Sequence, residues 1–558
     1  MAQVKSVAAN VVTAALARSW RLPPKLNGVR VTHDIPVPMR DGVVLLADHH
    51  APDTRDSRPT LLMRSPYGRG SLHRVLLSQP YAERGYHVVL QSTRGTWGSG
   101  GVMDPGHGEV EDGQDTIAWL RQQSWFDGRL VAAGISYLGY TAWSLAADPP
   151  PELKAMVIAL APHDMHLAAY GQGPFQLSDM MRWSELLACQ EDEGVLKLVL
   201  RALTAGKRLA PAMNRLPLVS SAEVIGGNCA PWYRQWINHA GYDDPYWNSR
   251  RASAALANAH VPVLLFGGLQ DFFLDQTLAQ YQALREGGAP VSLTLGPWTH
   301  MALEQKIVIP QTLSWMDHHV GGNGPVPRRQ AVRFRDSATG TWHTADCWPP
   351  PTDRHVLYLH PSGRLESQAP PKGRSSPPSS FRYDPAKPTP AVGGRTLAFD
   401  AGAKDNSRLE ERPDTLVFTT GTLTTSLKVA GTAILELHAR SDNPHADLFA
   451  RLCDVDRRGV STILTDRIVR LASATTGGES PVLHLELTGL AYTFKPGHRI
   501  RLYFSGGAHP RYARNTDKSR TETQTATPAA TTWRIHHSHD HPSILVLPEI
   551  ANDSDARI

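Results

Sequence analysis

The sequence contains few cysteines, and they lie far apart. Cys189, Cys229, Cys347 and Cys453 are the four in 558 residues, and no two of them form a CxxC pair. Scattered cysteines of this kind are typical of proteins from a reducing compartment. We therefore expect neither a disulfide framework nor a cysteine-bound zinc ion.

The sequence also lacks a long hydrophobic run and a large excess of either charge. No window approaches the roughly 18 consecutive apolar residues that a membrane-spanning helix needs, so we predict a soluble protein with no membrane partner. Its 57 Lys and Arg residues against 52 Asp and Glu residues give a net charge of +5. No stretch combines clustered Lys and Arg with aromatic side chains, which excludes nucleic acid as a partner.

The first 24 residues share some features with a secretion signal. Lys5 precedes a largely apolar stretch over 7–17, but Asn10 and Thr13 interrupt it and Arg18 follows at once. A signal peptide has an uninterrupted apolar core. We therefore predict an N-terminal amphipathic helix and a cytoplasmic protein, with secretion by a weak signal as the alternative.

The chain contains enough hydrophobic residues to form several hydrophobic cores. With 41% hydrophobic residues, a chain of this length predicts about three domains and excludes a disordered protein. The 45 Gly and 43 Pro residues make up nearly 16% of the chain, against an average of about 12%. This surplus favours many tight turns and much β structure, and it argues against a purely helical bundle.

Short apolar runs alternate with helical patterns in the first half of the chain. This alternation predicts a layered βα fold with a largely parallel sheet, whose strands are apolar because both faces are covered. The range 37–45 predicts an antiparallel hairpin with an Asp41-Gly42 turn, and Leu274 to Arg285 predicts a surface helix. The six expected strands are Thr60 to Arg64, His87 to Gln91, Leu130 to Gly134, Ala155 to Leu160, Val261 to Phe266 and Val291 to Leu295.

Two later regions depart from this pattern. Between Met165 and Ser249, apolar residues recur at helical spacing without intervening strands, which predicts a helical cap that bounds a substrate pocket. After about Val320, Pro349–Pro351 and eight more prolines by Pro390 exclude long helices. Sandwich strands are then expected at Ala433 to His438, Ala446 to Leu452, Leu483 to Leu487 and Ile500 to Phe504.

The sharpest local motif is Gly134-Ile-Ser136-Tyr-Leu-Gly139. It follows an apolar strand and precedes a helical run over 140–147. Small residues around a serine at such a turn allow a strained backbone and a closely packed helix, which leave the hydroxyl exposed above the sheet. The common form of this elbow has glycine two residues after the serine, where this chain has Leu138. The motif predicts Ser136 as a nucleophile.

A nucleophilic serine requires a base and an acid that orients it, because its hydroxyl does not ionise near neutral pH. Asp271 follows one predicted strand and His300 follows the next. Catalytic groups collect at the carboxyl ends of strands in open α/β sheets. Ser136, Asp271 and His300 are therefore predicted to converge as a catalytic triad.

Acyl transfer also needs donors for the developing oxyanion. The backbone N–H of Tyr137, the residue after the nucleophile, is one expected donor. The chain has no HGGG loop; instead, the strand ending at Arg64 runs into Ser65-Pro-Tyr67-Gly68. A tyrosine hydroxyl with a usual pKa near 10 stays protonated and can donate, so we predict Tyr67 as the second donor.

These motifs resemble those of the CocE/NonD hydrolases, the family of cocaine esterase, X-Pro dipeptidyl peptidases and α-amino acid ester hydrolases. The resemblance extends along nearly the whole chain. In the first part it comprises Val37 to Gly42, Arg64 to Tyr67, Thr93 to Gly95, Gly98 to Gly100, Trp125 to Gly128, Gly134 to Gly139 and Gly296 to His300. In the last part it comprises Tyr383 to Pro385, Pro388 to Pro390, Asp447 to Leu452 and Pro496 to Ile500, which look like that family's jelly-roll motifs.

The resemblance implies an α/β fold, with an α/β-hydrolase core, an inserted helical cap and a C-terminal β jelly roll. The expected boundaries are 1–164 and 250–322 for the core, 165–249 for the cap and 323–558 for the jelly roll. It also implies the triad at Ser136, Asp271 and His300 and the oxyanion hole at Tyr67 and Tyr137.

Some residues differ from the family pattern. The family often has Asp where this chain has Ser92, and cocaine-hydrolysing members have a tryptophan where Ala169 stands. Trp183 and Phe273 look like retained aromatic residues of the substrate pocket. The change at Ala169 argues against cocaine itself as the substrate.

We predict a serine hydrolase that cleaves carboxylic esters through an acyl-enzyme on Ser136. It should need no cofactor or metal, and its partners are a small-molecule ester and, at most, a second copy in a homodimer. The first alternative is an amide acylase or X-Pro dipeptidyl aminopeptidase. Glu191-Asp-Glu193 is the candidate acidic group for binding an α-ammonium, although such a run is more often a solvated helix face.

The remaining alternatives belong to other classes of protein. One is a carbohydrate-binding protein that uses the jelly roll. The other is a metal site formed by His536, His537, His539 and His541, which lack the helical spacing of common zinc sites.

Overall fold

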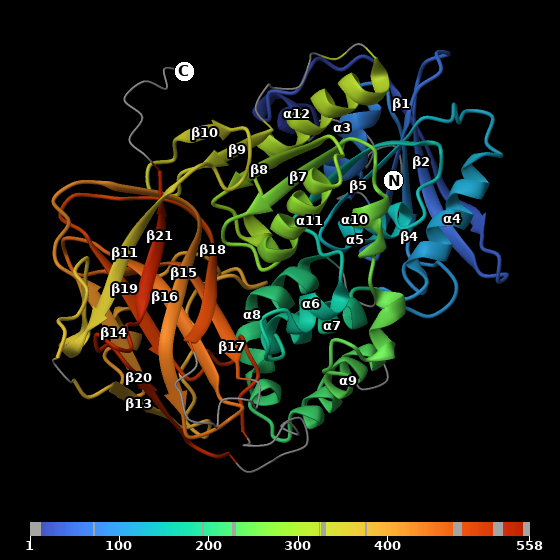
Figure 1. Ribbon diagram of the computed structural model, residues 1–558. Helices are drawn as coiled ribbons and strands as arrows, with labels where there is room; N and C mark the ends of the chain where they lie inside the picture. Colours follow the sequence, from blue (N-terminus) through green and yellow to red (C-terminus); the bar gives the residue numbers. More distant parts are fainter. Residues whose placement is uncertain are drawn as a thin grey trace.

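The computed structural model describes residues 13–70, 73–191, 195–225, 230–322, 324, 331–373, 376–471, 482–516 and 528–550. Three parts are arranged around a common centre (Figure 1): a mixed α/β layer, a group of helices below it and a β-sandwich at its side. The predicted N-terminal helix falls mostly on residues outside this description, although 13–19 are helical. In the described residues, every helix is too short or too polar to cross a membrane.

The first sheet has ten strands in the order β1-β2-β4-β3-β5-β6-β7-β8-β9-β10. Strands β3 to β9 run parallel, whereas β1, β2 and β10 join antiparallel at the two ends. All six predicted strands are present, with ends that differ by at most two residues. The bounds are β1 Val29–Pro38, β2 Val44–Pro52, β3 Thr60–Ser65, β4 His87–Ser92, β5 Leu130–Ile135, β6 Leu153–Ala159, β7 Val263–Gly268, β8 Val291–Gly296, β9 Val332–Arg335 and β10 Trp342–Ala345.

Helices cover both faces of this sheet, which explains its apolar strands. In β3, Leu62 packs with one hydrophobic cluster while Leu61 and Met63 pack with another, since alternate side chains point to opposite faces. The helices α4 (Glu109–Leu120), α5 (Tyr137–Ala146), α10 (Ala254–Asn258) and α11 (Leu274–Glu286) contribute mainly to the first cluster. The helices α3 (Gln79–Ala82) and α12 (Gln305–Met316) contribute to the second.

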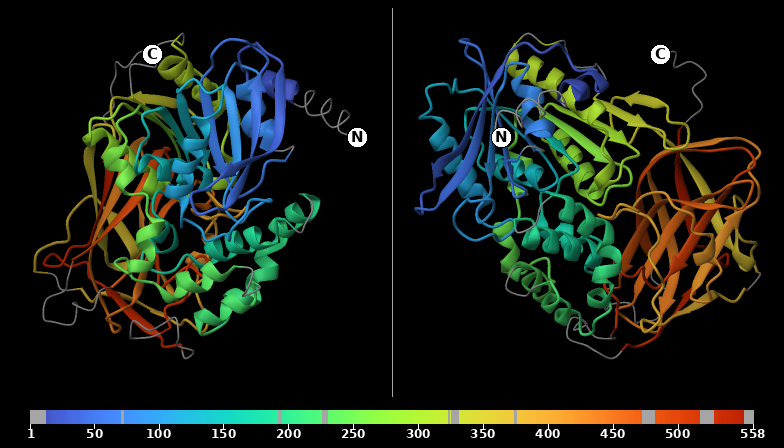
Figure 2. Two further views of the ribbon diagram at one scale, coloured as in Figure 1. Left: turned by 90° about the vertical axis from the view of Figure 1, so that its right-hand side faces the viewer. Right: turned by 180° about the vertical axis from the view of Figure 1, so that it is seen from behind.

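The predicted cap is helical. It contains α6 (Met165–Tyr170), α7 (Leu177–Cys189), α8 (Val195–Met213) and α9 (Pro231–Asn238), with the 3-10 turns η2 (Leu218–Glu223) and η3 (Pro245–Arg250). Figure 2 shows these helices below the first sheet and beside the sandwich in both views. The cap therefore lies along one edge of the first sheet.

The C-terminal part is the expected β-sandwich. Its strands pair almost entirely antiparallel around a separate hydrophobic cluster, in the order β13-β20-β15-β21-β11-β12-β14-β19-β16-β17, with β18 on β15. The bounds are β11 Asp353–His360, β12 Arg364–Glu366, β13 Ser379–Tyr383, β14 Thr415–Thr420, β15 Leu427–Ser441, β16 Asp447–Val455, β17 Ser461–Arg470, β18 Val482–Phe494, β19 Arg499–Ser505, β20 Thr531–Ile535 and β21 Ile544–Glu549.

The first sheet continues beyond the expected boundary at residue 323. Strand β9 pairs in parallel with β8, and β10 returns antiparallel to β9 (Figure 1), so both extend the first sheet. Val332 and Phe334 alternate into the hydrophobic cluster on one face of that sheet. Their burial there explains why the chain stays in the first sheet until Ala345, and the sandwich begins with β11.

Charged groups join the sandwich to the first part of the chain. Asp275 of α11 accepts from Arg395, Arg467 and Thr488, and the two arginines hold the pKa of its carboxyl down to about 2 against the effect of burial. The cap is attached as well, because Ser178 N–H donates to the Pro510 carbonyl at 3.1 Å. The three parts therefore hold one another in fixed positions around the site.

Candidate active site

Ser136 occupies a sharp turn between β5 and α5. Its φ of 58° and ψ of −127° are unusual for a residue with a side chain, and such strain is typical of functional positions. The flanking glycines make the turn possible. A Cβ on Gly134 would lie 2.1 Å from the Leu138 carbonyl carbon, and one on Gly139 would lie 2.4 Å from the Ala161 Cβ.

Asp271 and His300 meet at Ser136, as the sequence predicts. His300 Nε2 lies 2.9 Å from Ser136 Oγ, and His300 Nδ1 lies 2.7 Å from Asp271 Oδ2. Because an ionised carboxylate only accepts hydrogen bonds, Nδ1 carries the proton and Nε2 is left to accept from the serine. The Asp271 side chain is completely buried and also accepts from the Phe273 N–H at 2.9 Å. This arrangement can remove a proton from the serine during attack.

Two phenylalanines pack against the imidazole. The rings of Phe272 and Phe273 contact His300 edge-on, with centroid separations of 5.0 and 5.5 Å. They shield the pair formed by His300 and Asp271 from water, which strengthens the electrostatic interaction between them.

The two predicted oxyanion donors lie on either side of Ser136. Tyr137 is the first residue of α5, and the first N–H groups of a helix have no acceptor within it. The Tyr67 hydroxyl accepts from Trp183 Nε1 at 2.9 Å, which leaves its own proton available to donate. Burial raises the pKa of Tyr67 to about 12, although hydrogen bonds to Trp183 and Ser136 oppose the rise.

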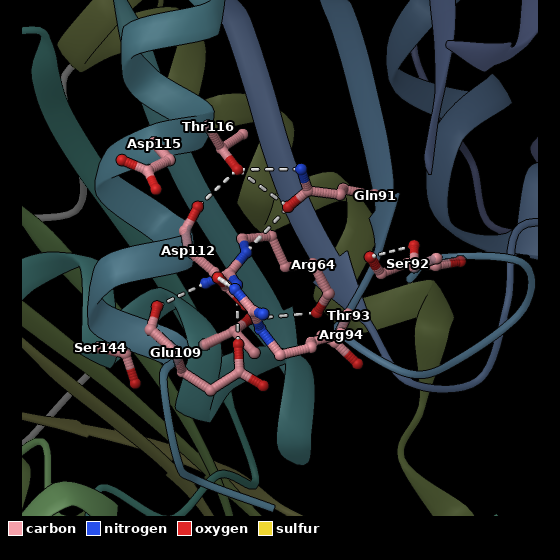
Figure 3. Close-up of polar contacts among 12 residues, drawn as sticks. Arg64, Gln91, Ser92, Thr93, Arg94, Glu109, Asp112, Asp115, Thr116 and Ser144 are labelled. Atoms are coloured by element: carbon pink, nitrogen blue, oxygen red, sulfur yellow. Dashed lines mark hydrogen bonds and ion pairs between the residues drawn. The ribbon is translucent and has the colours of Figure 1, made fainter. Parts of the chain in front are cut away.

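A buried ionic network supports both donors (Figure 3). The Tyr137 hydroxyl donates to Glu109 Oε1 at 2.8 Å. Glu109 Oε2 pairs with Arg64 Nη2 at 2.8 Å. Arg64 also donates to Gln91 Oε1 and to the Glu109 carbonyl. Arg64 lies three residues before Tyr67, so one network fixes the chain segments that carry the two donors. Burial raises the pKa of the Glu109 carboxyl and, well above its usual value, that of Tyr137.

The network continues to the surface hairpin. Arg94 donates to Asp112 Oδ1 at 2.6 Å and to Asp41 Oδ2 at 2.7 Å, and these interactions raise the pKa of Arg94 and lower that of Asp41. Figure 3 shows Arg94 and Arg64 side by side, both facing α4. Three motifs that are distant in the sequence are thereby connected: the Asp41-Gly42 turn, Thr93 to Gly95 and the segment before Tyr67.

Ser92, where the family pattern has Asp, accepts a hydrogen bond from Arg69. The same guanidinium pairs with Asp48 Oδ1 at 3.1 Å and with Asp34 Oδ1 at 2.7 Å. The charge of Arg69 is therefore balanced by two other carboxylates, which explains how a neutral serine is accommodated at this position.

A cavity of about 410 Å³ opens next to Ser136. Its lining comes from all three parts of the chain and consists mainly of carbon atoms. The core contributes Tyr67, Ser136, Tyr137, Phe272, Phe273 and His300; the cap contributes Met165, Ala168, Met180, Arg182, Trp183, Glu185, Leu186, Leu198, Arg201, Ala202 and Ala205; and the sandwich contributes Leu397 and Phe399.

The sandwich residues of this cavity lie on a closed loop. Gly394 and Gly402 exchange two backbone hydrogen bonds of 2.9 Å, and the loop between them carries Leu397 and Phe399 to the cavity. Phe399 is 56% exposed, so an apolar ring stands at the entrance.

The predicted aromatic residues Trp183 and Phe273 both lie in the cavity wall. Trp183 stacks on Trp236 with a centroid separation of 5.9 Å, which holds the indole that donates to Tyr67. Ala169 is buried beside the cavity, and its neighbour Ala168 lines the wall.

Other candidates from the sequence lie elsewhere. Glu191 Oε1 accepts from the Trp97 N–H at 2.7 Å, while Asp192 and Glu193 lie outside the described residues. His537 contacts two serine hydroxyls and His539 a backbone carbonyl. Across the described ranges, no three His, Cys, Asp or Glu residues are grouped as metal ligands.

The cysteines form no disulfide among the described residues. Cys189, Cys347 and Cys453 are unbridged, and Cys229 lies outside the described residues.

Sequence reasoning did not identify Glu109, because an acid in the first turn of a helix is common and only the tertiary contact to Tyr137 distinguishes it.

Two family models and several known proteins match the chain. Residues 41–302 match the family model for X-Pro dipeptidyl-peptidase (S15 family), and residues 325–546 match that for the X-Pro dipeptidyl-peptidase C-terminal non-catalytic domain. The chain is 29% identical to cocaine esterase of Rhodococcus sp. (strain MB1 Bresler), over 93% of this chain and 98% of the esterase.

Two solved structures share the fold over nearly their whole length. An aminopeptidase from the marine sediment archaeon Thaumarchaeota archaeon has a TM-score of 0.78 at 23% identity, and an α-amino acid ester hydrolase has 0.78 at 21%. Each match covers 95% of this chain and 98% of the other. A CocE/NonD family hydrolase from Staphylococcus aureus has a TM-score of 0.65 at 17% identity, with 94% of each chain covered.

Proposed function

Because the chain is a serine hydrolase of the S15 family, we propose that it hydrolyses carboxylic esters through an acyl-enzyme on Ser136. The observation that carries this proposal is the position of His300, which bridges Ser136 and the buried Asp271 at 2.9 and 2.7 Å. This is the geometry that activates a serine hydroxyl for nucleophilic attack.

The reaction has two steps. His300 Nε2 takes the proton of Ser136 as Oγ attacks the acyl carbonyl, and the imidazolium then gives this proton to the leaving alcohol. Asp271 keeps the imidazole in the required tautomer and stabilises its positive charge. The Tyr67 hydroxyl and the Tyr137 N–H donate to the tetrahedral oxyanion. Water, deprotonated by His300, then releases the acid and restores Ser136.

Amide or peptide hydrolysis is the second candidate, since the aminopeptidase of similar fold belongs to that class. An enzyme that binds a substrate's α-ammonium needs a carboxylate that is available to pair with it. Glu185 is the one acidic residue among the described residues of the cavity wall, and it already pairs with Arg201 and Arg208. This pairing favours esters without a free amine.

Release of p-nitrophenol from its acetate and butyrate esters tests the proposal. The wild type should be active, and Ser136→Ala should lose about 10⁴-fold or more of kcat. Ser144→Ala, at a buried serine of α5 whose hydroxyl donates to the Tyr140 carbonyl, is the matched control. Equal rates for wild type and Ser136→Ala would contradict the proposal.

Further assays separate the alternatives. A fluorophosphonate should label the wild type and not Ser136→Ala; a protein that only binds carbohydrate would not be labelled. Matched ester and amide substrates, each with and without a free α-amine, should show faster hydrolysis of the ester without the amine.

A further inference from the structure

The cap wall of the cavity, formed by α7 and α8, carries more positive than negative side chains among its described residues. Arg182 and Glu185 of α7 and Arg201 of α8 line the cavity. Glu185 accepts from Arg201 Nη1 at 2.6 Å and from both terminal nitrogens of Arg208, the Nη2–Oε2 distance being 2.7 Å. The single carboxylate of this wall is therefore shared by two guanidinium groups.

No described acid lies within ion-pair distance of Arg182, although Asp179 attracts its charge at longer range. Within the described part of the chain, no carboxylate pairs with its guanidinium, and its buried Nε has no hydrogen-bond partner. Asp179, one turn earlier on α7, instead accepts from the Thr396 hydroxyl at 2.5 Å and the Leu397 N–H at 2.9 Å. A buried donor without an acceptor is unfavourable. The Arg182 side chain lines the cavity, so a ligand that supplies an acceptor to its guanidinium gains affinity.

The opposite helix leaves space for this guanidinium. Gly206 lies inside α8, where glycine is less favourable than alanine. A Cβ at Gly206 would lie 3.3 Å from Arg182 Nη2, which is closer than ordinary van der Waals contact. The glycine therefore allows Arg182 to lie against α8 at the cavity wall.

The surroundings define the kind of ligand that fits. Leu198, Ala202 and Ala205 of α8, with Leu397 and Phe399 from the sandwich, present an apolar surface to the same cavity. A planar guanidinium binds a carboxylate through two parallel hydrogen bonds. The complementary ligand has an apolar body and a terminal carboxylate.

We propose that Arg182 binds a carboxylate carried by the ester substrate at a distance from the scissile bond, so that anionic, amphiphilic esters are the preferred substrates. This inference rests on the proposed ester hydrolysis at Ser136. It is the opposite of an aminopeptidase pocket, in which a carboxylate of the protein binds an ammonium of the substrate.

Two matched substrate pairs test the proposal. In the acyl pair, mono-p-nitrophenyl adipate is compared with its methyl-capped ester; in the alcohol pair, 4-acetoxybenzoate is compared with its methyl ester. The first member of each pair has a carboxylate and the second does not. In at least one pair, the wild type should have a kcat/KM about tenfold or more higher for the carboxylate, the scale of a charge-assisted hydrogen bond.

The variants identify the residue responsible. Arg182→Met should abolish this preference, chiefly through KM for the carboxylate, and Arg182→Lys should retain part of it. Arg215→Met removes one positive charge from an exposed surface pair with Glu223, and it should leave the preference unchanged. Addition of salt should weaken the wild-type preference for the carboxylate substrate. In Arg182→Met, salt should leave the ratio of the two kcat/KM values unchanged.

Different results would contradict the carboxylate site and the proposed ester hydrolysis. Equal wild-type kcat/KM values within both pairs, or a preference that survives in Arg182→Met, would overturn the carboxylate site alone. Undiminished hydrolysis by Ser136→Ala, or no hydrolysis of any of the four esters by the wild type, would overturn the ester hydrolase itself and this inference with it.

Discussion

The two walls of the active-site cavity balance charge differently. On the catalytic wall, formed by the core residues around Ser136 and the ionic network behind them, charged groups have partners in the protein: Asp271 has His300, Arg64 has Glu109 and Arg94 has Asp112. On the cap wall, Arg182 has none among the described residues. The charges of the catalytic wall are therefore paired without a substrate, whereas the charge of Arg182 on the cap wall has no ion pair among the described residues.

This difference separates two tasks. Groups that stabilise a transition state must be fixed beforehand, because reorganisation during the reaction would raise the barrier. Groups that select a substrate gain specificity when they are satisfied only in the complex, since a substrate without the matching group leaves them unpaired. Substitutions on the catalytic wall should therefore lower kcat, whereas those on the cap wall should change the choice of substrate.

The largest effect on the catalytic wall, after loss of Ser136 itself, is expected for Asp271→Asn. The amide cannot hold the imidazole in the tautomer that accepts from Ser136, so kcat should fall by about 10⁴-fold. Hydrolysis of p-nitrophenyl butyrate measures this effect. Asp115→Asn, on α4 and paired with the half-exposed Arg40, is the control and should stay within about twofold of wild type. A loss of less than tenfold in Asp271→Asn would remove Asp271 from the triad.

A smaller loss is expected for Tyr67→Phe. Removal of one oxyanion donor should lower kcat by about 10² to 10³-fold, which corresponds to about 2.7–4 kcal/mol, with little change in KM. Tyr242→Phe, at a tyrosine of the cap that is 48% exposed, is the matched control. An unchanged kcat in Tyr67→Phe would assign the second donor to another group.

The pH dependence gives an independent readout for Tyr67. Because the pKa of Tyr67 is raised to about 12, its hydroxyl keeps its proton up to high pH and can still donate a hydrogen bond to the oxyanion. An ordinary tyrosine with a pKa near 10 would lose the donor progressively between pH 9 and 11. The ratio of wild-type kcat to that of Tyr67→Phe should therefore stay constant from pH 7 to 10.5. A ratio that falls towards one above pH 9 would contradict this assignment.

The smallest effects come from a pair of glycines, one on each wall. In Gly134→Ala the new Cβ meets backbone at 2.1 Å, whereas in Gly206→Ala it meets the end of a flexible arginine at 3.3 Å. Overpacking against backbone should lower the free energy of unfolding by about 1–3 kcal/mol. For Gly206→Ala, the gain in helix propensity of about 1 kcal/mol offsets the contact. Thermal unfolding of both variants measures the difference; equal destabilisation would contradict it.

The convergence of Ser136, Asp271 and His300 could be predicted from the sequence because each of these residues has a local signal. Ser136 lies in a strand–turn–helix motif, and Asp271 and His300 each follow a buried strand. Strand order and strand ends are encoded in short apolar runs. These signals suffice to predict that residues more than 100 positions apart in the sequence meet at one edge of the sheet. The position of Tyr67 is predicted in the same way, because it also follows a buried strand.

The cap wall could not be predicted in this way. The charges of Arg182, Glu185 and Arg208 are typical of any exposed helix surface. Only the packing of α7 against α8 determines that Glu185 pairs with Arg208 while Arg182 has no ion pair among the described residues. The extension of the first sheet by β9 and β10 could not be predicted for a related reason. Strand β9 spans only Val332–Arg335, and its place depends on pairing with β8 rather than on its own four residues.

The loop closed by Gly394 and Gly402 places part of the substrate pocket in a segment that contributes no reacting group. The catalytic residues and some of the pocket residues are thus encoded in separate stretches of the gene. Changes in this loop can therefore alter the shape of the pocket while Ser136, Asp271 and His300 stay in place.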